Sequence, residues 1–409
     1  MFNLEEFINQ YVTKRSESMF DADVHDNTAE LREKIENKSV LVIGGAGSIG
    51  SSFIRALLPF NPAELVVVDT NENALTELTR SLRSSSILSA VMPDIYLSYP
   101  MDYSSITFRR MFSHHKRSNG THGFDIVANF SAHKHVRSEK DIYSVEALLR
   151  NNVISAKKLL DILSVYPPEI YFCVSTDKAA NPVNIMGASK RIMEDLIFSF
   201  SDVFPVKTAR FANVAFSNGS LPLGFLERIN QRQPLSAPSD VKRYFVSPKE
   251  SGQICLLAAI FGQNREIFFP KLDAAQMTTF DKIAEDLLTN FGYEVDYCAT
   301  DQEAIEKSKK WTEDKPYPVH FSESDTSGEK AFEEFYIPGE EVDMNKFKSL
   351  GVIKDKSITD RNAVVELIRT LDNAFESENC CKADIVNILS QYLPSFEHIE
   401  TGKSLDGKM

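Results

Sequence analysis

The sequence lacks long apolar runs and has no excess of positive charge. No apolar stretch reaches the roughly 20 residues that a membrane-spanning helix needs. The first residues, MFNLEEFINQYV, carry acids where a secretory signal would need a basic and then an apolar stretch. We therefore expect a cytoplasmic protein. Because 45 Lys and Arg stand against 58 Asp and Glu, the formal net charge is −13, and we expect neither nucleic-acid nor membrane partners.

Cysteine is also scarce and has no functional spacing. The chain shows neither a CxxC pair nor a Cys/His spacing typical of a metal site. Two of the cysteines are adjacent, which is a poor basis for a disulfide framework. We therefore expect ordinary thiols and no bound metal. The five residues are Cys173, Cys255, Cys298, Cys380 and Cys381.

The pattern of apolar residues favours an α/β fold. Of the 409 residues, 43% are hydrophobic and 25% are charged, as in an ordinary folded protein with one large or two modest domains. From Ser39 onward, short apolar runs alternate with amphipathic stretches, which is typical of a doubly wound parallel sheet of the Rossmann type. The runs are SVLVIG, ELVVVD, DIYLS, FDIVANF, EIYFCVS and PVKTARF.

Breaks in this rhythm divide the chain into four predicted parts. The first is a helical N-terminal extension with two short helices, FNLEEFINQYV and DNTAELREKIEN, the second capped by Asp26 or Asn27. An NAD-binding Rossmann domain with the catalytic segment follows. A smaller mixed α/β substrate-binding portion, interleaved with that domain, comes next, and a helical C-terminal extension ends the chain. Their ranges are 1–38, 39–217, 218–350 and 351–409.

Two of these parts contain further predicted elements. The substrate-binding portion should hold helices at ESGQICLLAAIF and TTFDKIAEDLLTNF and strands at REIFFPK and YEVDYC. The C-terminal extension should hold helices at DRNAVVELIRTLDNAF and KADIVNILSQYL, and we expect its polar end, TGKSLDGKM, to be disordered. The terminal helices have apolar faces that could contact a second subunit or cover their own domain. We expect a homo-oligomer.

A glycine-rich loop, GGAGSIG, joins the first apolar run to a helix. Its GxxGxxG spacing is typical of a loop that turns sharply, approaches a pyrophosphate and packs a helix on a strand. The amides of the first helical turn would face the phosphates. The sequence therefore predicts a dinucleotide site, with Gly44, Gly47, Ser48, Ile49 and Gly50 in the loop.

Two acidic residues extend this predicted site. Asp69 ends ELVVVD, where its carboxylate can accept hydrogen bonds from both ribose hydroxyls and would repel a 2′-phosphate, which favours NAD over NADP. Asp102, in YPMDYSS, could reach the adenine. The alternatives are a turn or cap residue for Asp69 and a helix N-cap for Asp102.

Polar residues follow the run EIYFCV, at the carboxyl end of a predicted strand. Ser175, Thr176, Asp177 and Lys178 come first, and Lys190 follows twelve residues later on a predicted helix. Ligands of parallel sheets bind outside the carboxyl ends of the strands. Asp177 and Lys178 could supply one proton donor and one acceptor. Alternatively they form a surface ion pair.

The segment STDKAANPVNIMGASKR resembles the active-site segment of the extended short-chain dehydrogenase/reductase superfamily. Within it, the segment is most similar to that of the nucleotide-activated N-acetylglucosamine 4,6-dehydratases of bacterial glycan synthesis. The segments NFSAHKHV, LLRNNV, RFANVAFSNGS, DVKRYFVS and SGEKAFEEF follow the order of that family. The resemblance covers roughly Ser39 to Phe335.

The resemblance implies an NAD-dependent hydro-lyase that acts on UDP- or GDP-N-acetylglucosamine. Lys178 matches the base that takes the C5 proton, and Asp177 matches the acid that protonates the departing 6-hydroxyl. The superfamily's YxxxK motif is here Met186-Gly-Ala-Ser-Lys190, and a thioether has no proton to transfer. Thr176 could orient the C4 hydroxyl while Asp177 or Lys178 accepts its proton, and Lys190 would hold the nicotinamide ribose. Met186 could equally be a core residue.

Further positions match residues that line the sugar or its diphosphate in that family. For Lys134 and His135 the alternative is a solvated loop, and for Arg243 it is a surface ion pair. Glu329 and Lys330 match a family segment in which loops vary. The implied substrate contacts are Lys134, His135, Asn152, Asn213, Ser220 and Arg243.

Two other functions remain open. A sugar-nucleotide 4-epimerase would need the same NAD and crevice but no acid and base at C5 and C6, so Asp177 and Lys178 argue against it. A catalytically silent protein that binds NAD or a sugar nucleotide is suggested by Met186.

Overall fold

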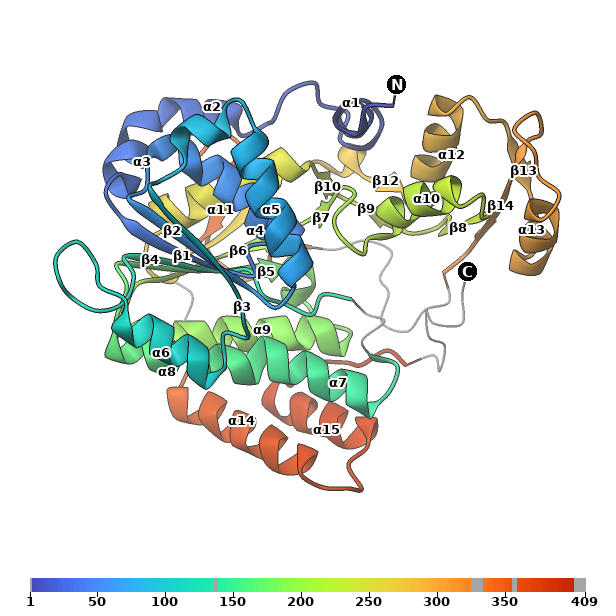
Figure 1. Cartoon of the computed structure of the whole chain (residues 1–409). Coiled ribbons are helices and arrows are strands. Elements are labelled where there is room, and N and C mark those ends of the chain that lie inside the picture. The colour runs from blue at the N-terminus through green and yellow to red at the C-terminus, as the bar shows by residue number, and fades with distance from the viewer. Residues whose placement is uncertain (1, 136–138, 325–333, 355–358, 401–409) are drawn as a thin grey trace.

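A large, mostly parallel sheet forms the centre of the molecule (Figure 1). The computed structural model describes residues 2–135, 139–324, 334–354 and 359–400. Within them, the sheet has the strand order β15-β16-β11-β6-β5-β4-β1-β2-β3, and only β15 and β16 run antiparallel to their neighbours. The strands are β1 (Ser39–Ile43), β2 (Glu64–Asp69), β3 (Ile95–Pro100), β4 (Ile126–Asn129), β5 (Ile170–Thr176), β6 (Val206–Phe211), β11 (Ile267–Pro270), β15 (Val342–Asp343) and β16 (Leu350–Ile353).

Helices cover both faces of this sheet (Figure 1). On one face, α4 and α11 pack so closely that a Cβ at Gly252 would lie 2.2 Å from the carbonyl oxygen of Ser52. All six predicted apolar runs form strands, which confirms the doubly wound Rossmann-type fold. The helices of the two faces are α4 (Ser48–Leu57), α5 (Glu72–Ser84) and α11 (Pro248–Phe261), and α6 (Ile106–His114), α7 (Ile142–Leu149), α8 (Ser155–Val165) and α9 (Ile185–Phe198).

A smaller portion with its own apolar core lies beside the large sheet (Figure 1). Its parallel sheet has the order β13-β14-β8, and the short pairs β7–β10 and β9–β12 connect it to the main sheet region. Its elements are α10 (Leu221–Asn230), β8 (Leu235–Pro238), α12 (Phe280–Asn290), β13 (Val295–Tyr297), α13 (Asp301–Ser308) and β14 (Tyr317–Ser322), and the short strands are β7 (Asn213–Val214), β9 (Lys242–Arg243), β10 (Phe245–Val246) and β12 (Thr278–Thr279).

The predicted strand REIFFPK and helix ESGQICLLAAIF form, but they belong to the large sheet and not to the smaller portion. β11 pairs with β6, and α11 packs against α4. The reason is the composition of α11, which is apolar around most of its circumference, so that every residue from Glu250 to Ile260 is buried. Such a helix needs a sheet on one side and another helix on the other.

The N-terminal extension has three helical segments where the sequence predicted two. α1 (Leu4–Phe7) continues into the π-helical turn Ile8–Val12, and α2 (Asp21–Asp26) precedes α3 (Thr28–Ile35). Asn27 stands at the predicted cap position, but its side chain caps nothing. Its Nδ2 donates instead to the Asp23 carbonyl, 2.7 Å away, because the same residue ends α2.

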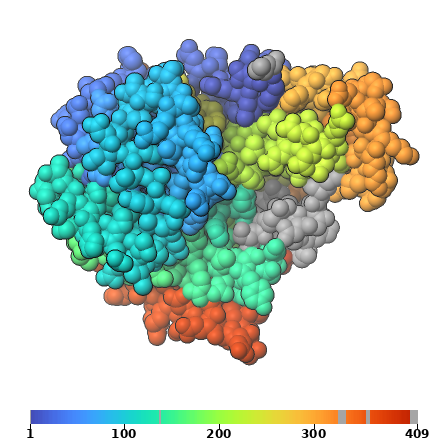
Figure 2. Space-filling model, in the orientation of Figure 1, coloured from blue at the N-terminus to red at the C-terminus, as the bar shows by residue number. Residues whose placement is uncertain are grey.

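The apolar faces of the terminal helices are buried within the chain itself. Phe7 and Val12 join the core of the smaller portion, and Figure 2 shows the dark blue N-terminal segment lying over both portions. α14 (Arg361–Phe375) and α15 (Lys382–Tyr392) confirm the predicted C-terminal helices. α14 packs against α9 and α15, and Leu371 and Leu389 are buried in the main core. These faces therefore no longer argue for a second subunit, and the homo-oligomer stays a prediction. The predicted disordered end, 401–409, lies outside the described residues.

The cysteines and the helix lengths bear on two of the predictions. All five cysteines are free, and burial raises the pKa of Cys173 to about 12, which makes it a poor nucleophile. In the described part of the chain, no helix is both long and apolar enough to cross a bilayer. The cytoplasmic location stays a prediction.

Candidate functional site

The glycine loop between β1 and α4 has the close backbone contacts that its sequence predicts. Gly44 has a φ of +69°, and a Cβ there would lie 2.6 Å from the backbone nitrogen of Ser131. A Cβ at Gly50 would lie 2.4 Å from the carbonyl oxygen of Gly44. Because neither backbone can yield without moving a strand, both positions require glycine. The two glycines thus allow the loop to turn tightly against the backbone after β4 and against itself.

Gly47, Ser48 and Ile49 begin α4. Gly47 is its N-cap, with an ordinary φ of −71°, and the nearest atom to a Cβ there would be 3.4 Å away. The protein alone therefore leaves room for a methyl group at Gly47, so its need for glycine would come from a ligand. The Ser48 hydroxyl accepts a hydrogen bond from the Asn218 amide (2.8 Å), which joins the loop to the SNGS segment.

The two predicted acidic cofactor residues hold backbone turns. Asp69, at the end of β2, accepts from the amide of Ala46 in the glycine loop (3.1 Å) and from the amide of Asn71 (3.0 Å). Its turn role is therefore present, and the carboxylate lies against the predicted dinucleotide loop. Asp102 accepts from the Ser104 amide (2.7 Å) in the turn before α6. The ribose and adenine contacts stay predictions.

The N-cap of α6 is not Asp102, the residue that the sequence suggested. Ser105 is the N-cap, and its side chain accepts from the Phe108 amide at 3.2 Å. The alternative that Asp102 is the helix N-cap is therefore wrong.

The predicted acid and base lie where β5 ends. Asp177 begins a 3-10 turn, Asp177–Ala179, and its Oδ1 accepts three hydrogen bonds. They come from the Thr176 hydroxyl (2.8 Å), the Lys178 amide (2.9 Å) and the Lys178 ammonium (3.3 Å). The side chains of Asp177 and Lys178 are only 5% and 16% exposed, so the surface ion pair is the wrong alternative. Three donor groups of two neighbouring residues thus fix one carboxylate oxygen.

Lys190 reaches the same end of β5 from α9. Its Nζ donates to the Val174 carbonyl (2.9 Å) and contacts the Met193 sulfur (3.6 Å). Burial lowers the pKa of the Lys190 ammonium below its usual range. The structure therefore brings Lys190 and the Asp177–Lys178 pair to one strand end, as the sequence predicted.

The first turn of α9 is fixed against this strand end. Asn184 caps it by accepting from the Gly187 amide (2.7 Å), and a Cβ at Gly187 would lie 2.8 Å from the Lys178 carbonyl oxygen. Met186 is 3% exposed and lies in the main hydrophobic core, which confirms that it packs as a core residue. Its amide donates to the buried carboxylate of Glu139 (2.9 Å).

A buried ion pair beneath the site was not predicted. Glu194 on α9 and Arg210 on β6 are both fully buried and meet at 2.9 Å, and Glu194 also accepts from the Ser175 hydroxyl (2.6 Å). Burial disfavours both charged side chains, but their mutual attraction and hydrogen bonds outweigh that effect. The pKa of Glu194 is therefore lowered and that of Arg210 is raised. Charged residues inside the apolar runs IMEDLIF and VKTARF were the available signal.

Lys134 and His135 are exposed, as the solvated-loop alternative expects, and both also contact the SNGS segment. The Lys134 Nζ donates to the Ser217 hydroxyl at 3.3 Å. A Cβ at Gly219, whose φ is +73°, would lie 3.0 Å from the His135 Nε2. The SNGS segment therefore meets both the loop after β4 and, through Asn218, the glycine loop.

Asn152 is buried and its amide is used within the protein. Its Oδ1 accepts from the His133 amide (2.8 Å), and its Nδ2 donates to the His133 carbonyl (2.9 Å) and the Ser189 hydroxyl (3.0 Å). These bonds hold the loop after β4 against α9. Direct contact of Asn152 with substrate stays a prediction, whereas its positioning of the loop is observed.

The remaining predicted substrate residues lie along the smaller portion. Asn213 is on β7, and Ser220 caps α10 by accepting from the Leu223 amide (3.4 Å). Arg243 on β9 is 5% exposed, which does not fit the alternative of a surface ion pair. Its guanidinium donates to the Lys242 carbonyl (2.9 Å). Glu329 and Lys330 lie outside the described residues.

The sheet order defines the class of this chain as an α/β protein with a Rossmann-type domain. The chain belongs to the polysaccharide biosynthesis protein family, whose sequence profile matches residues 40–355. A similar protein is the probable polysaccharide biosynthesis protein EpsC of Bacillus subtilis, 28% identical over 324 residues. The match covers 78% of this chain and 50% of EpsC, so the chain spans about half the length of that relative.

Two further similarities concern named sugar-nucleotide enzymes. The UDP-glucose 4-epimerase of Rickettsia canadensis is 25% identical over 261 residues, which cover 61% of this chain and 71% of the epimerase. The structure of a double mutant of DesIV, a dTDP-glucose 4,6-dehydratase from Streptomyces venezuelae with NAD and DAU bound, superposes with a TM-score of 0.55 at 18% identity. That superposition covers 72% of this chain and 87% of DesIV, and it shows a shared fold.

Proposed function

We propose that this chain is a nucleotide-sugar-modifying enzyme of bacterial polysaccharide biosynthesis. More specifically, we propose an NAD-dependent 4,6-dehydratase that acts on UDP-N-acetylglucosamine or GDP-N-acetylglucosamine. The observation that carries the proposal is the buried Asp177–Lys178 pair at the end of β5, oriented by Thr176. A dehydratase needs an acid and a base beside C5 and C6, and this pair supplies one of each.

The residues present fit a dinucleotide. Gly44 and Gly50 allow the loop to turn tightly against neighbouring backbone, and α4 begins directly after Gly47, so the amides of its first turn are available to a phosphate. Asp69 is bound to the same loop through Ala46, where a carboxylate favours NAD over NADP. The DesIV structure, whose fold this chain shares, was solved with NAD bound. When bound, NAD would accept the hydride from C4 and return it to C6.

Lys178 and Asp177 would carry out the elimination of water. The amine of Lys178 takes the proton from C5, whose acidity the C4 ketone raises. The electron pair forms the C5–C6 double bond while the C6–O bond breaks, and Asp177 gives its proton to the departing hydroxyl, which leaves as water. Lys178 then returns a proton to C5.

The first proton transfer, from the C4 hydroxyl, needs a group other than Met186. Thr176 lies next to Asp177 and would orient the hydroxyl. Asp177 would accept the proton, directly or through Lys178, and would therefore hold it for the departing hydroxyl. Lys190, held by the Val174 carbonyl, would bind the nicotinamide ribose. The family-matched residues Lys134, His135, Asn152, Asn213, Ser220 and Arg243 would bind or position the sugar and its diphosphate.

The test is incubation of the full chain with UDP-N-acetylglucosamine, and separately with GDP-N-acetylglucosamine, in deuterated water with NAD. We expect a product that has lost one water and carries deuterium at C5, detected by mass spectrometry and proton NMR. Asp177→Asn and Lys178→Met should lower kcat by about 10²- to 10⁴-fold. Asp161→Asn, which changes the exposed Lys157–Asp161 pair on α8, is the matched control. An unchanged substrate with no deuterium at C5 would contradict the proposal.

A 4-epimerase is the second candidate, because the Rickettsia relative carries that name. An epimerase would give a product of unchanged mass with an inverted C4 configuration, and it would not depend on a base at C5. The same NMR spectrum therefore separates the two reactions. A protein that binds NAD and the sugar nucleotide but gives neither product is the catalytically silent alternative.

A further inference from the structure

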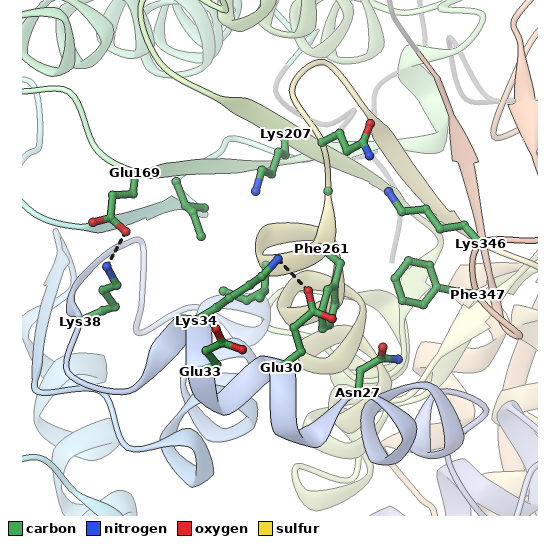
Figure 3. A pocket seen from close by; sticks show the side chains of 14 residues that line it. Asn27, Glu30, Glu33, Lys34, Lys38, Glu169, Lys207, Phe261, Lys346 and Phe347 are labelled. Carbon is green, nitrogen blue, oxygen red and sulfur yellow. Dashed lines mark hydrogen bonds and ion pairs between the residues drawn. The ribbon is translucent and has the colours of Figure 1, made fainter.

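A cavity lies at the amino edge of the large sheet, where β5 and β6 begin, and Figure 3 shows the side chains that line it. It has a volume of about 710 Å³, within the range of small-molecule sites. Its walls come from α3, the amino ends of β5 and β6, the end of α11 and residues 346–347. We call it the amino-edge cavity. The side chains that matter below are Lys34, Lys207, Lys346, Phe261 and Phe347.

Lys207 is the unusual residue of this cavity. It is 6% exposed, and its Nζ donates one hydrogen bond, to the Ala259 carbonyl at 2.9 Å. Among the described residues, no carboxylate forms an ion pair with it. Burial, together with the charges of Lys34 and Lys346, lowers its pKa to about 8. A buried ammonium with no carboxylate in direct contact is costly, and a bound anion would compensate for that cost.

Two acids of the cavity, Glu30 and Glu169, and the neighbouring Glu266 are already paired with other lysines. Lys34 binds Glu30 (2.9 Å), Lys38 binds Glu169 (2.6 Å), and Lys346 binds the nearby Glu266 (2.6 Å). Figure 3 shows the first two of these pairs as dashed lines, with Lys207 apart from both.

Glu33 is exposed on α3 and makes no ion pair with Lys207, and the charge of Glu266, which pairs with Lys346, acts on Lys207 without an ion-pair contact. Within the described residues, Lys207 is therefore the lysine of the cavity lining that has no carboxylate in ion-pair contact.

We propose that the amino-edge cavity binds a small anion with phosphate or carboxylate groups, with Lys207 as its central contact and Lys34 and Lys346 beside it. Gly262 leaves the space for the Lys207 stem, since a Cβ there would lie 3.0 Å from the Lys207 Cδ. The rings of Phe261 and Phe347 would contact the apolar part of the ligand. Because the cavity opens at the amino edge, an occupant leaves the carboxyl edge free for the sugar nucleotide.

The first test is calorimetric titration of the full chain with pyrophosphate and, separately, with citrate. Lys207→Met should lose one binding event or weaken it at least tenfold, whereas Lys282→Met, which removes an exposed lysine of α12, should bind like the wild type. Any binding at the glycine loop is common to all variants. Binding of pyrophosphate alone would indicate a phosphate ligand, and binding of citrate alone a carboxylate ligand. Equal stoichiometry and affinity in all three proteins would overturn the proposal.

A second measurement needs no variant. Acetic anhydride acetylates unprotonated lysines, and peptide mass spectrometry gives the rate at each position. We expect saturating pyrophosphate or citrate to slow acetylation of Lys207 at least fivefold and to leave Lys282 unchanged. An unaltered Lys207 rate in the presence of both anions would contradict the site, even if Lys207→Met failed to fold.

Discussion

Asp177 is oriented by its immediate neighbours in the sequence. The hydroxyl of Thr176 and both nitrogens of Lys178 donate to the same oxygen, Oδ1. Three adjacent residues therefore contain both the proposed acid and base and the groups that fix the acid. This is why a short motif was sufficient to predict the centre of the site, although other residues around it come from distant parts of the sequence.

Met186 fills core space, and its substitution should therefore depend on shape. The side chain is 3% exposed within the main core, while its amide binds Glu139 through the backbone. Met186→Leu should change the free energy of unfolding by less than about 1.5 kcal/mol. It should also keep kcat within about threefold. A folded Met186→Leu protein whose kcat falls by about 100-fold would show that the thioether takes part in the reaction.

Lys207 should make stability depend on pH. Its pKa falls from 10.5 to about 8 on folding, so between these values the unfolded chain binds more protons and stability rises with pH. Below pH 8 the full cost is present, and it corresponds to about 3 kcal/mol. Lys207→Met should therefore stabilise the protein at pH 7 by up to this amount, less the lost bond to Ala259, and by almost nothing near pH 10.5.

Urea unfolding at the two pH values, in buffer free of phosphate and citrate, measures this difference. Lys282→Met is again the control, since its exposed ammonium pairs with Asp286 at the surface. A Lys207→Met protein with the same excess stability at both pH values would contradict the assigned proton linkage.

At the scale of elements, the turn from β1 into α4 holds glycines for two different reasons, close backbone packing and room for a ligand. A Cβ at Gly50 would meet the backbone of Gly44 at 2.4 Å, whereas at Gly47 it would make only an ordinary contact at 3.4 Å. Gly50→Ala should therefore cost about 1 to 3 kcal/mol of unfolding free energy. Gly47→Ala should fold with nearly unchanged stability, within about 0.5 kcal/mol.

Both variants should bind NAD at least tenfold more weakly, Gly47→Ala because its methyl group would occupy the path of the pyrophosphate. Thermal unfolding and fluorescence titration with NAD measure the two effects separately. If Gly47→Ala bound NAD as the wild type does, the loop would not approach the dinucleotide in the proposed way.

The strands of the Rossmann half could be predicted because their periodicity is local. Each run is buried on both faces, so β1 is apolar throughout and needs no distant information. The placement of α11 and β11 could not be predicted, because it depends on which sheet their apolar surfaces meet. β16 is only four residues long, LGVI, and it becomes a strand through its pairing with β11.

The same distinction holds for the site. The residues of the glycine loop and of Thr176 to Lys190 follow from short motifs. Glu139 and the Glu194–Arg210 pair do not, because their partners lie on other elements: the Glu139 carboxylate binds α9, and Glu194 on α9 pairs with Arg210 on β6. A charged residue in an apolar run reveals that a partner must exist, but only the fold identifies it.

At the scale of the whole molecule, both terminal extensions connect distant parts of the chain. The C-terminal segment returns to the catalytic helix, where the Ile399 amide donates to the Val183 carbonyl (3.1 Å) and His398 lies 3.4 Å from Glu139. The N-terminal segment places Phe7 in the core of the smaller portion, and its Arg15 binds Glu250 on α11 of the large one. The extensions therefore stabilise the arrangement in which the two portions face each other.

Arg15 provides the clearest test of this bridging. Its guanidinium makes two bonds of 2.8 Å to Glu250 and one of 3.0 Å to the Phe245 carbonyl, and the two side chains are 12% and 2% exposed. Arg15→Met leaves the Glu250 carboxylate buried and unpaired, so it should cost about 3 to 5 kcal/mol of unfolding free energy. Adding Glu250→Gln should recover part of that loss, because the charge is then gone.

Arg232→Met is the matched control, because the Arg232–Glu313 pair is 66% and 69% exposed and should be worth less than about 1 kcal/mol. Urea unfolding monitored by fluorescence of Trp311, in the smaller portion, and by far-ultraviolet circular dichroism of the whole chain reports both portions. We expect Arg15→Met to shift the Trp311 transition to lower urea than the dichroism transition, because the smaller portion loses its connection to α11. Coincident transitions with a loss no larger than that of Arg232→Met would show that the N-terminal segment does not bridge the two portions.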